Sequence, residues 1–183
     1  TNVSSARPLY RGHAQPRAPR DLGYADLRLP ETRAAQADLA REYGLHGFCY
    51  YYYWFDGRRL LERPLQEVLA SGQPGFPFCL CWANENWTRR WDGLDDEVLI
   101  GQEHSLDSSR RFINDVIPIL KDPRYIRFEG RPVLVIYRAN AIPDIEETLE
   151  MWRAECRAQG VGEIHLAAVR FWDLVDAEAM GFD

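Results

Sequence analysis

The sequence lacks the features that identify several common protein classes. Its 22 basic residues are outnumbered by 28 acidic residues, which gives a net charge of −6, whereas nucleic-acid-binding domains usually carry a basic surface. No apolar run approaches the roughly 18 residues that a membrane-spanning helix requires. The chain starts at Thr1 without the basic and apolar segments of a secretion signal. We therefore expect neither a nucleic-acid partner nor a membrane span.

Motifs for nucleotides and metals are missing as well. The sequence contains no Walker-type loop and no G-x-G-x-x-G segment. The absence of these motifs argues against the binding of nucleotide phosphates through them. The histidines show neither metal-ligand nor catalytic-triad spacing, and each is interpreted as a structural or solvent-exposed residue. They are His13, His46, His104 and His165. We therefore expect no cofactor and no metal ion.

Cysteine is sparse and does not follow a metal-binding or disulfide pattern. Cys79 and Cys81 lie two residues apart in an apolar run, which places both on one face of a predicted strand, and Cys49 and Cys156 are isolated. Such cysteines most often pack as small hydrophobic side chains with free thiols. This usage favours a reducing compartment, and we expect the protein to be cytoplasmic.

Aromatic residues are what the sequence holds in excess. They make up 13% of the 183 residues, beside an ordinary 46% of hydrophobic and 27% of charged residues. That balance is typical of a globular domain that buries a core without disulfides or metals. Because domains mostly run to about 100–200 residues, the length predicts a single domain over residues 1–183, or part of a larger one.

Alternating strand and helix patterns predict an α/β fold with a parallel sheet. Residues 1–30 read as a long loop, and a helix follows from Pro30 to about Tyr43. Apolar runs, which indicate strands covered on both faces, occupy residues 47–55, 76–83, 133–137 and 164–169. The expected connecting segments are helices at about 60–70, 106–120 and 145–159, a short extended piece at 96–100, and a further helix near Leu174.

Aromatic and polar side chains gather where the predicted strands end, and sites in parallel α/β folds lie beyond those ends. Aromatic rings cover the C–H faces of a sugar, while carboxylates, amides and arginines bond its hydroxyls. We therefore expect a sugar or oligosaccharide partner. The predicted substrate-binding residues are Tyr52, Trp54, Trp82, Asn84, Trp87 and Tyr137. For the mid-strand residues Tyr50, Tyr51 and Phe78 we favour a core role instead.

Glu85 is the carboxylate that we single out for chemistry. It lies in a polar, aromatic loop between two asparagines, with a tryptophan on either side. An aromatic surrounding can raise the pKa of a carboxyl group and suit it to acid–base catalysis. Two alternatives stay open: Glu85 accepts sugar hydroxyls, or it forms a salt bridge to Arg89 or Arg90 that holds the loop. Binding ranks first, the salt bridge second and catalysis third.

Three stretches of the sequence together resemble a known family. They are GFCYYYYWF at 47–55, LLERPL at 60–65 and FCLCWANENWT at 78–88. The chain resembles the WbsX-type glycosyltransferase family, a glycoside hydrolase family 99-like domain of bacterial polysaccharide (O-antigen) biosynthesis. Shorter matches extend the resemblance over nearly the whole chain, at residues 1–3, 12–16, 22–24, 124–126 and 132–137.

The resemblance implies a (β/α)₈ TIM-barrel-like fold and an enzyme acting on glycosidic bonds of cell-surface polysaccharide or lipopolysaccharide. A closed barrel typically needs about 250 residues and only four strands are readable, so we expect a partial barrel. Family 99-like domains carry paired catalytic glutamates in a late Asn-Glu-Trp-x-Glu-Gly type segment, which the sequence lacks. The resemblance therefore assigns no catalytic glutamate in this sequence. The hypothesis for Glu85 depends only on the residues that surround it.

Two classes of function stay open. In the first, the chain belongs to an enzyme that makes or cleaves glycosidic bonds, since transfer and hydrolysis pass through a similar oxocarbenium-like centre. In the second, it is a non-catalytic sugar-binding module that uses the same aromatic residues. A self-contained four-stranded domain is disfavoured, because its apolar sheet edges would be bare in water. No feature of the sequence indicates an oligomeric state.

Overall fold

The computed structural model describes residues 6–13, 19, 21–89, 94–172 and 176–183. The chain divides into two units, Thr1–Leu45 and His46–Asp183. Within the described ranges, no helix combines the length and the apolar character that crossing a membrane demands.

Helix α2, Pro30–Glu42, belongs to the first unit. Pro30 suits the first turn, where its missing N–H group leaves no hydrogen bond unmade. The Nη1 group of Arg33 donates to the Leu27 carbonyl at 2.6 Å, which ties the helix to the preceding turn. Gly44 follows at a φ of 73°, a left-handed conformation that commonly ends helices. This helix confirms the prediction from the sequence.

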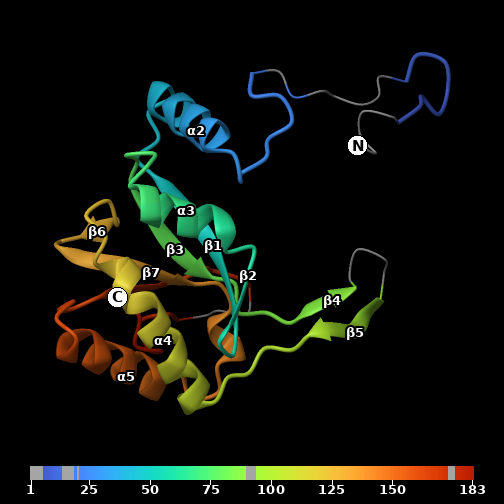
Figure 1. The fold of residues 1–183 in the computed structure, drawn as a ribbon. Coiled ribbons are helices and arrows are strands. Elements are labelled where there is room, and N and C mark those ends of the chain that lie inside the picture. The colour runs from blue at the N-terminus through green and yellow to red at the C-terminus, as the bar shows by residue number, and fades with distance from the viewer. Residues whose placement is uncertain (1–5, 14–18, 20, 90–93, 173–175) are drawn as a thin grey trace. The chain divides into compact units, whose positions relative to one another are not determined.

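A six-stranded sheet organises the second unit (Figure 1). Its order is β2–β1–β3–β7–β6, and β8 also pairs with β7. The parallel strands are β1 (Phe48–Phe55), β3 (Phe78–Trp82), β7 (Arg131–Ile136) and β8 (His165–Ala168). The antiparallel edge strands are β2 (Arg58–Leu60) and β6 (Arg127–Phe128). The four predicted parallel strands are therefore confirmed, while a closed barrel is not formed by the described residues.

Helices connect these strands, as the sequence predicts. They are α3 (Arg63–Ser71), α4 (Leu106–Leu120) and α5 (Ile145–Ala158), with a short 3-10 helix, η2 (Ala139–Ala141). The side chain of Ser105 caps α4 by accepting a hydrogen bond from the Ser108 N–H at 3.1 Å. Pro118 lies inside this helix, which continues to Leu120. The start of the helix expected near Leu174 falls outside the described residues.

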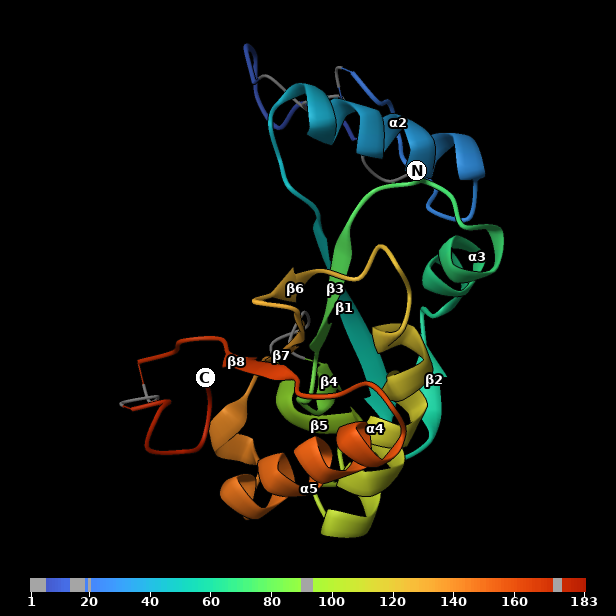
Figure 2. The ribbon, with the colours of Figure 1, turned by 90° about the vertical axis from the view of Figure 1, so that its left-hand side faces the viewer.

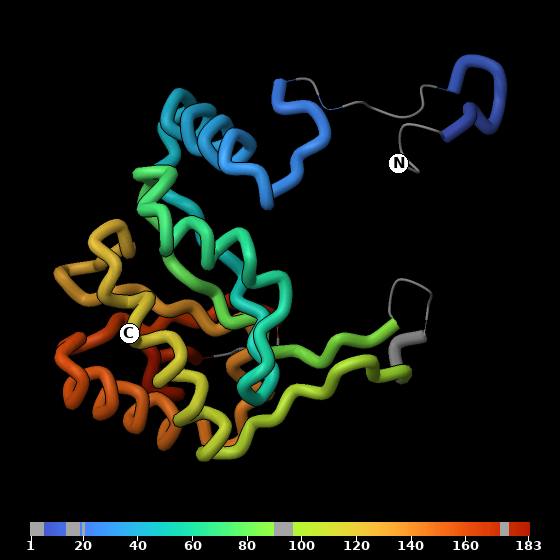
Figure 3. The backbone as a smooth tube through the Cα atoms, in the orientation of Figure 1, coloured from blue at the N-terminus to red at the C-terminus, as the bar shows by residue number. Residues whose placement is uncertain are grey.

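An antiparallel pair interrupts the alternation of strands and helices. After β3 the backbone forms β4 (Trp87–Arg89) and β5 (Leu94–Ile100), and then enters α4 (Figure 3). This pair accounts for part of the long spacing between the second and third parallel strands. The short extended piece predicted at residues 96–100 is confirmed as the end of β5.

Helices α4 and α5 lie beside the sheet (Figure 2), and aromatic side chains of both helices pack against it. The ring of Trp82 stacks on Phe112 of α4 with centroids 4.1 Å apart, and Trp152 of α5 lies 5.8 Å from Trp82. The indole N–H of Trp152 donates to the Ser109 carbonyl at 2.9 Å, so its polar atom is satisfied inside the core. This packing fixes one face of the sheet.

Strand β1 presents two different faces. Tyr52 and Trp54 are 4% and 1% exposed, whereas Tyr51 is 54% exposed and Cys49 is exposed as well. Side chains alternate along a strand, and the face that bears Tyr52 packs against Phe112 of α4. The prediction that this strand is covered on both faces is therefore wrong for the described chain. The other face opens toward a cavity.

Candidate functional site

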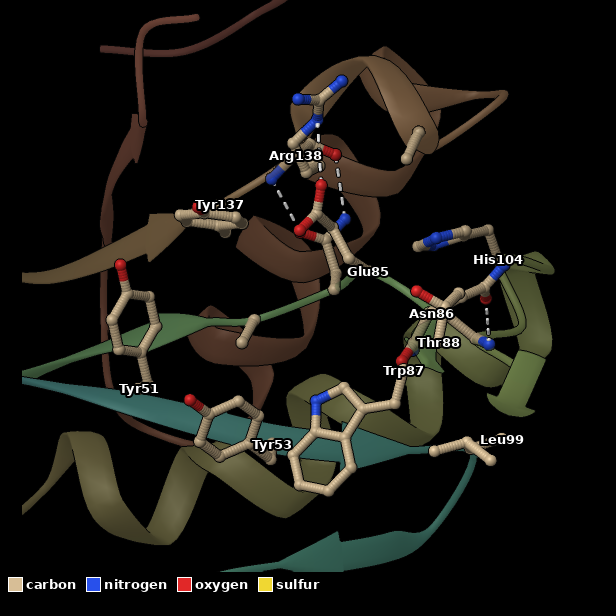
Figure 4. A pocket seen from close by; sticks show the side chains of 14 residues that line it. Tyr51, Tyr53, Glu85, Asn86, Trp87, Thr88, Leu99, His104, Tyr137 and Arg138 are labelled. Carbon is tan, nitrogen blue, oxygen red and sulfur yellow. Dashed lines mark hydrogen bonds and ion pairs between the residues drawn. The ribbon is translucent and has the colours of Figure 1, made fainter. Parts of the chain in front are cut away.

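A cavity of about 810 Å³ opens at the carboxyl ends of β1, β3 and β7 (Figure 4). Its lining comes from these strand ends, from β4 and from the segment between β5 and α4. Ligands of α/β folds bind at this end of the sheet, and the volume suits a small molecule.

Four aromatic rings line the cavity (Figure 4). Tyr51 meets Tyr137 edge to face at 5.6 Å, and Tyr53 meets Trp87 at 5.3 Å. Burial raises the pKa of the Tyr51 and Tyr53 phenols, so both stay protonated at neutral pH and can donate hydrogen bonds. The lining thus combines ring faces with hydroxyl groups.

Glu85 and Arg138 supply the charges of the cavity. The carboxylate Oε1 of Glu85 lies 3.7 Å from the Nε of Arg138, with side chains 44% and 28% exposed. The guanidinium of Arg138 also lies 4.5 Å above the Phe171 ring, a cation–π contact. An exposed ion pair of this kind contributes only about 0–1 kcal/mol, so a ligand that bonds to either side chain can displace it at little cost.

The salt bridge considered for Glu85 is present with a different partner. The sequence suggested Arg89 or Arg90 as the partner, but Glu85 pairs with Arg138 at the end of β7. Arg89 pairs with Glu97 of β5 at 3.3 Å, and Arg90 lies outside the described residues. The partner was missed because Arg138 is far away in the sequence and comes close only through the pairing of β3 with β7.

Asn84 holds two strand ends together. It is fully buried, its Nδ2 donates to the Arg138 carbonyl at 2.8 Å, and its Oδ1 accepts the Arg138 N–H at 2.7 Å. The nitrogen and the oxygen of its amide therefore both bond to the backbone of Arg138, which follows β7. Asn84 lines the cavity and positions Arg138 there.

Three predicted binding residues lie in the core instead of the cavity lining. The Tyr52 hydroxyl donates to Asp115 at 2.6 Å, and Asp115 is also bonded to Arg59. The indole N–H of Trp82 donates to the Trp54 carbonyl at 3.3 Å. Burial, then the hydrogen bond to Asp115, raises the pKa of Tyr52. The structure thus brings Asn84, Glu85, Trp87 and Tyr137 together and places the other three predicted residues on the opposite face of the sheet.

Several lining residues were missed from the sequence. Tyr51 was interpreted as a core residue, which is wrong, because strand alternation carries it with Tyr53 to the open face. His104 and Gln102 reach the cavity from the segment after β5. Burial lowers the pKa of His104, against the effect of a hydrogen bond to the Asn84 backbone, and so favours a neutral ring. No spacing in the sequence indicates their position, because the β4–β5 pair turns the chain back.

The fold has a match among solved structures. The structure resembles a solved structure described as a glycoside hydrolase-like protein, with a TM-score of 0.56 and 15% identity, over 81% of this chain and 46% of that one. At that identity, the likeness shows a shared α/β fold alone.

Two relatives are much closer in sequence. They are the proteins described as "Uncharacterized protein WxcX" from two strains of Xanthomonas campestris pv. campestris, each 48% identical over 182 residues. The match covers the whole of this chain and 26% of each relative, so the chain spans about a quarter of their length. The family described as "Glycosyltransferase WbsX" matches residues 1–183. The chain therefore belongs to the WbsX glycosyltransferase family.

Proposed function

We propose that this chain is part of a carbohydrate-active enzyme that makes or cleaves glycosidic bonds in bacterial cell-surface polysaccharide, such as O-antigen or lipopolysaccharide. Its share of the enzyme is a sugar-binding cleft, in a single domain that forms part of a (β/α)₈ barrel. One observation carries the proposal: four aromatic rings and the Glu85–Arg138 pair line the same cavity at the strand ends. Membership of the WbsX family supports it.

The chemistry of the lining suits a sugar ring. Tyr51, Tyr53, Trp87 and Tyr137 offer apolar surfaces for the C–H groups of the sugar, and Glu85 and Arg138 offer an acceptor and donors for its hydroxyls. The pair lies between the ends of β3 and β7, where Asn84 fixes the backbone. A sugar stacked on the rings would therefore meet polar groups that are already in place.

Glu85 is the residue to which we assign a direct role in this cleft. Glycosidic chemistry usually employs two carboxylates about 5–9 Å apart. In the described lining, Glu85 is the one carboxylate. We assign Glu85 to the binding of sugar hydroxyls and to one place in such a pair, whose second carboxylate lies outside the described lining.

The substitution Glu85→Gln tests this assignment. A hydrogen bond to a charged group contributes about 1.5–3 kcal/mol, so we expect oligosaccharide binding, measured by titration calorimetry on the intact protein, to weaken by about 10- to 100-fold. Turnover of the same oligosaccharides should fall at least as much. Glu97→Gln is the matched control, because Glu97 is an exposed glutamate of β5 that pairs with Arg89 and does not line the cavity. Unchanged binding and turnover in Glu85→Gln would show the assignment to be wrong.

A non-catalytic sugar-binding module is the second candidate. The observation that favours it is the single carboxylate in the described lining. The same experiment separates the two candidates: binding together with turnover supports the enzyme, and binding without turnover by the intact protein supports the module.

A further inference from the structure

Two cysteines lie directly opposite each other on the open face of the sheet. The register of β1 and β3 pairs Cys49 with Cys79, and pairs Tyr51 with Cys81. Because side chains alternate along a strand, all four side chains share one face. Cys49 is exposed, whereas Cys79 and Cys81 are 8% and 3% exposed.

The spacing of the strands selects which pair can form a bond. Neighbouring strands lie about 4.8 Å apart, so the Cα atoms of the opposed residues Cys49 and Cys79 fall within the range of about 4.4–6.8 Å found in disulfides. Cys81 lies two residues further along, roughly 6.6 Å up the strand, so its Cα is about 8 Å from that of Cys49. That exceeds the limit of about 7 Å for bridging without backbone movement.

The surroundings also distinguish the two roles in an oxidation. Hydrogen bonds from Cys79 and then Cys81 lower the pKa of the Cys49 thiol below its ordinary value of 9.0, because thiol donors stabilise a neighbouring thiolate. The same contact with Cys49, followed by burial, raises the pKa of Cys79. The exposed thiol is thus the nucleophile and the buried one the resolving group. Over the described part of the chain, no group of three or more His, Cys, Asp or Glu side chains could hold a metal ion.

We propose that Cys49 and Cys79 form a reversible disulfide when the protein is exposed to hydrogen peroxide. The Cys49 thiolate attacks one peroxide oxygen, the O–O bond breaks, and hydroxide leaves and is protonated to water, so that Cys49 becomes a sulfenic acid. The sulfur of Cys79 then attacks the Cys49 sulfur, and the second water leaves with the thiol proton. Two thiols lose two electrons in total, and one peroxide is reduced to two waters. A dithiol such as dithiothreitol reverses the reaction by exchange.

Peptide mapping of the intact protein tests the pairing. After treatment with hydrogen peroxide and alkylation of the remaining thiols, we expect a cross-linked peptide containing Cys49 and Cys79 that dithiothreitol removes. Trypsin places Cys79 and Cys81 in one peptide, since no cleavage site separates them. Fragment ions that break the chain at Leu80 therefore assign the bonded residue.

Serine substitutions give matched variants. Cys79→Ser should abolish the bridge and leave a Cys49 sulfenic acid that dimedone traps, whereas Cys81→Ser should still form the bridge. Cys156→Ser on α5 is a second control, because Cys156 is buried and belongs to another element. A bridge from Cys49 to Cys81, or no bridge in the unsubstituted protein, would overturn the proposal. The map of the unsubstituted protein decides this even where a variant fails to fold.

Discussion

Replacing Asn84 with alanine tests how strongly this side chain holds the backbone of Arg138 in place. The side chain is fully buried and makes two hydrogen bonds, at 2.8 and 2.7 Å, to the backbone carbonyl and N–H of Arg138. Alanine removes the hydrogen-bond partners of the Arg138 carbonyl and N–H. The same residue carries the guanidinium that lines the cavity. We therefore expect a loss of stability and a displaced Arg138 from one substitution.

The size of the effect follows from the two bonds. Leaving a buried polar group without its partner costs about 1–3 kcal/mol, and Arg138 is only partly buried, so water can replace some of what is lost. We expect the free energy of unfolding to fall by about 2–4 kcal/mol. Asn84→Asp should be no better, because a carboxylate cannot donate to the Arg138 carbonyl and would place a charge in a fully buried position.

Urea unfolding followed by near-ultraviolet circular dichroism measures this change. Asn86→Ala is the matched control: Asn86 is exposed, and its Oδ1 accepts one hydrogen bond, from the Gln102 N–H at 2.6 Å. Its loss should cost about 0.5–1 kcal/mol. If Asn84→Ala destabilised the protein no more than Asn86→Ala, the positioning role of Asn84 would be refuted.

Two further predictions concern the core and the acid limit of stability. Trp82→Ala should lower the free energy of unfolding by about 3–5 kcal/mol, because the ring is fully buried. Trp172→Ala is the control, since this residue is 97% exposed and its loss should change the free energy by less than about 0.5 kcal/mol. Equal effects of the two substitutions in urea unfolding would contradict the described core. The hydrogen bond from Arg124 holds the pKa of Asp122 below its ordinary value of 3.8, so the unfolded chain takes up the proton first and this stabilisation is lost as the pH falls below 3.8. Asp122→Asn should therefore flatten the fall in unfolding free energy in that range, and an unchanged slope would count against the pairing.

The order of strands and helices could be predicted because local patterns determine it. The apolar run at residues 47–55 and the helical spacing at residues 106–120 each correspond to an element found within one or two residues of the expected bounds. The sequence also places the carboxyl ends of the strands, and hence the edge of the sheet at which the cavity lies. The pairing of β4 with β5 was harder to predict, because one of its strands has only three residues.

The sequence did not predict which residues of β1 face the core and which face the cavity. Four consecutive tyrosines, at residues 50–53, give no contrast between polar and apolar positions, and that contrast normally tells the two faces of a strand apart. Tyr52 was therefore assigned to binding and Tyr51 to the core, whereas the structure buries Tyr52 and exposes Tyr51. Arg138 was missed as a partner of Glu85 for another reason: their contact depends on the order of strands in the sheet, which a single sequence does not specify.

The two faces of β1 depend on each other. On the inner face, Tyr52 bonds to Asp115 of α4, which also pairs with Arg59 of β2, and Trp54 packs on Phe112 with ring centroids 5.5 Å apart. These contacts fix the backbone that carries the outer-face residues, so the tyrosine positions of the cleft are set when the chain folds. The entropy cost of ordering that backbone then belongs to folding and not to binding, which favours binding of the proposed sugar to a rigid aromatic surface. The aromatic excess of this strand thus serves a core that needs large side chains on one face and, under the proposed function, a sugar-binding cavity that needs rings held in place on the other.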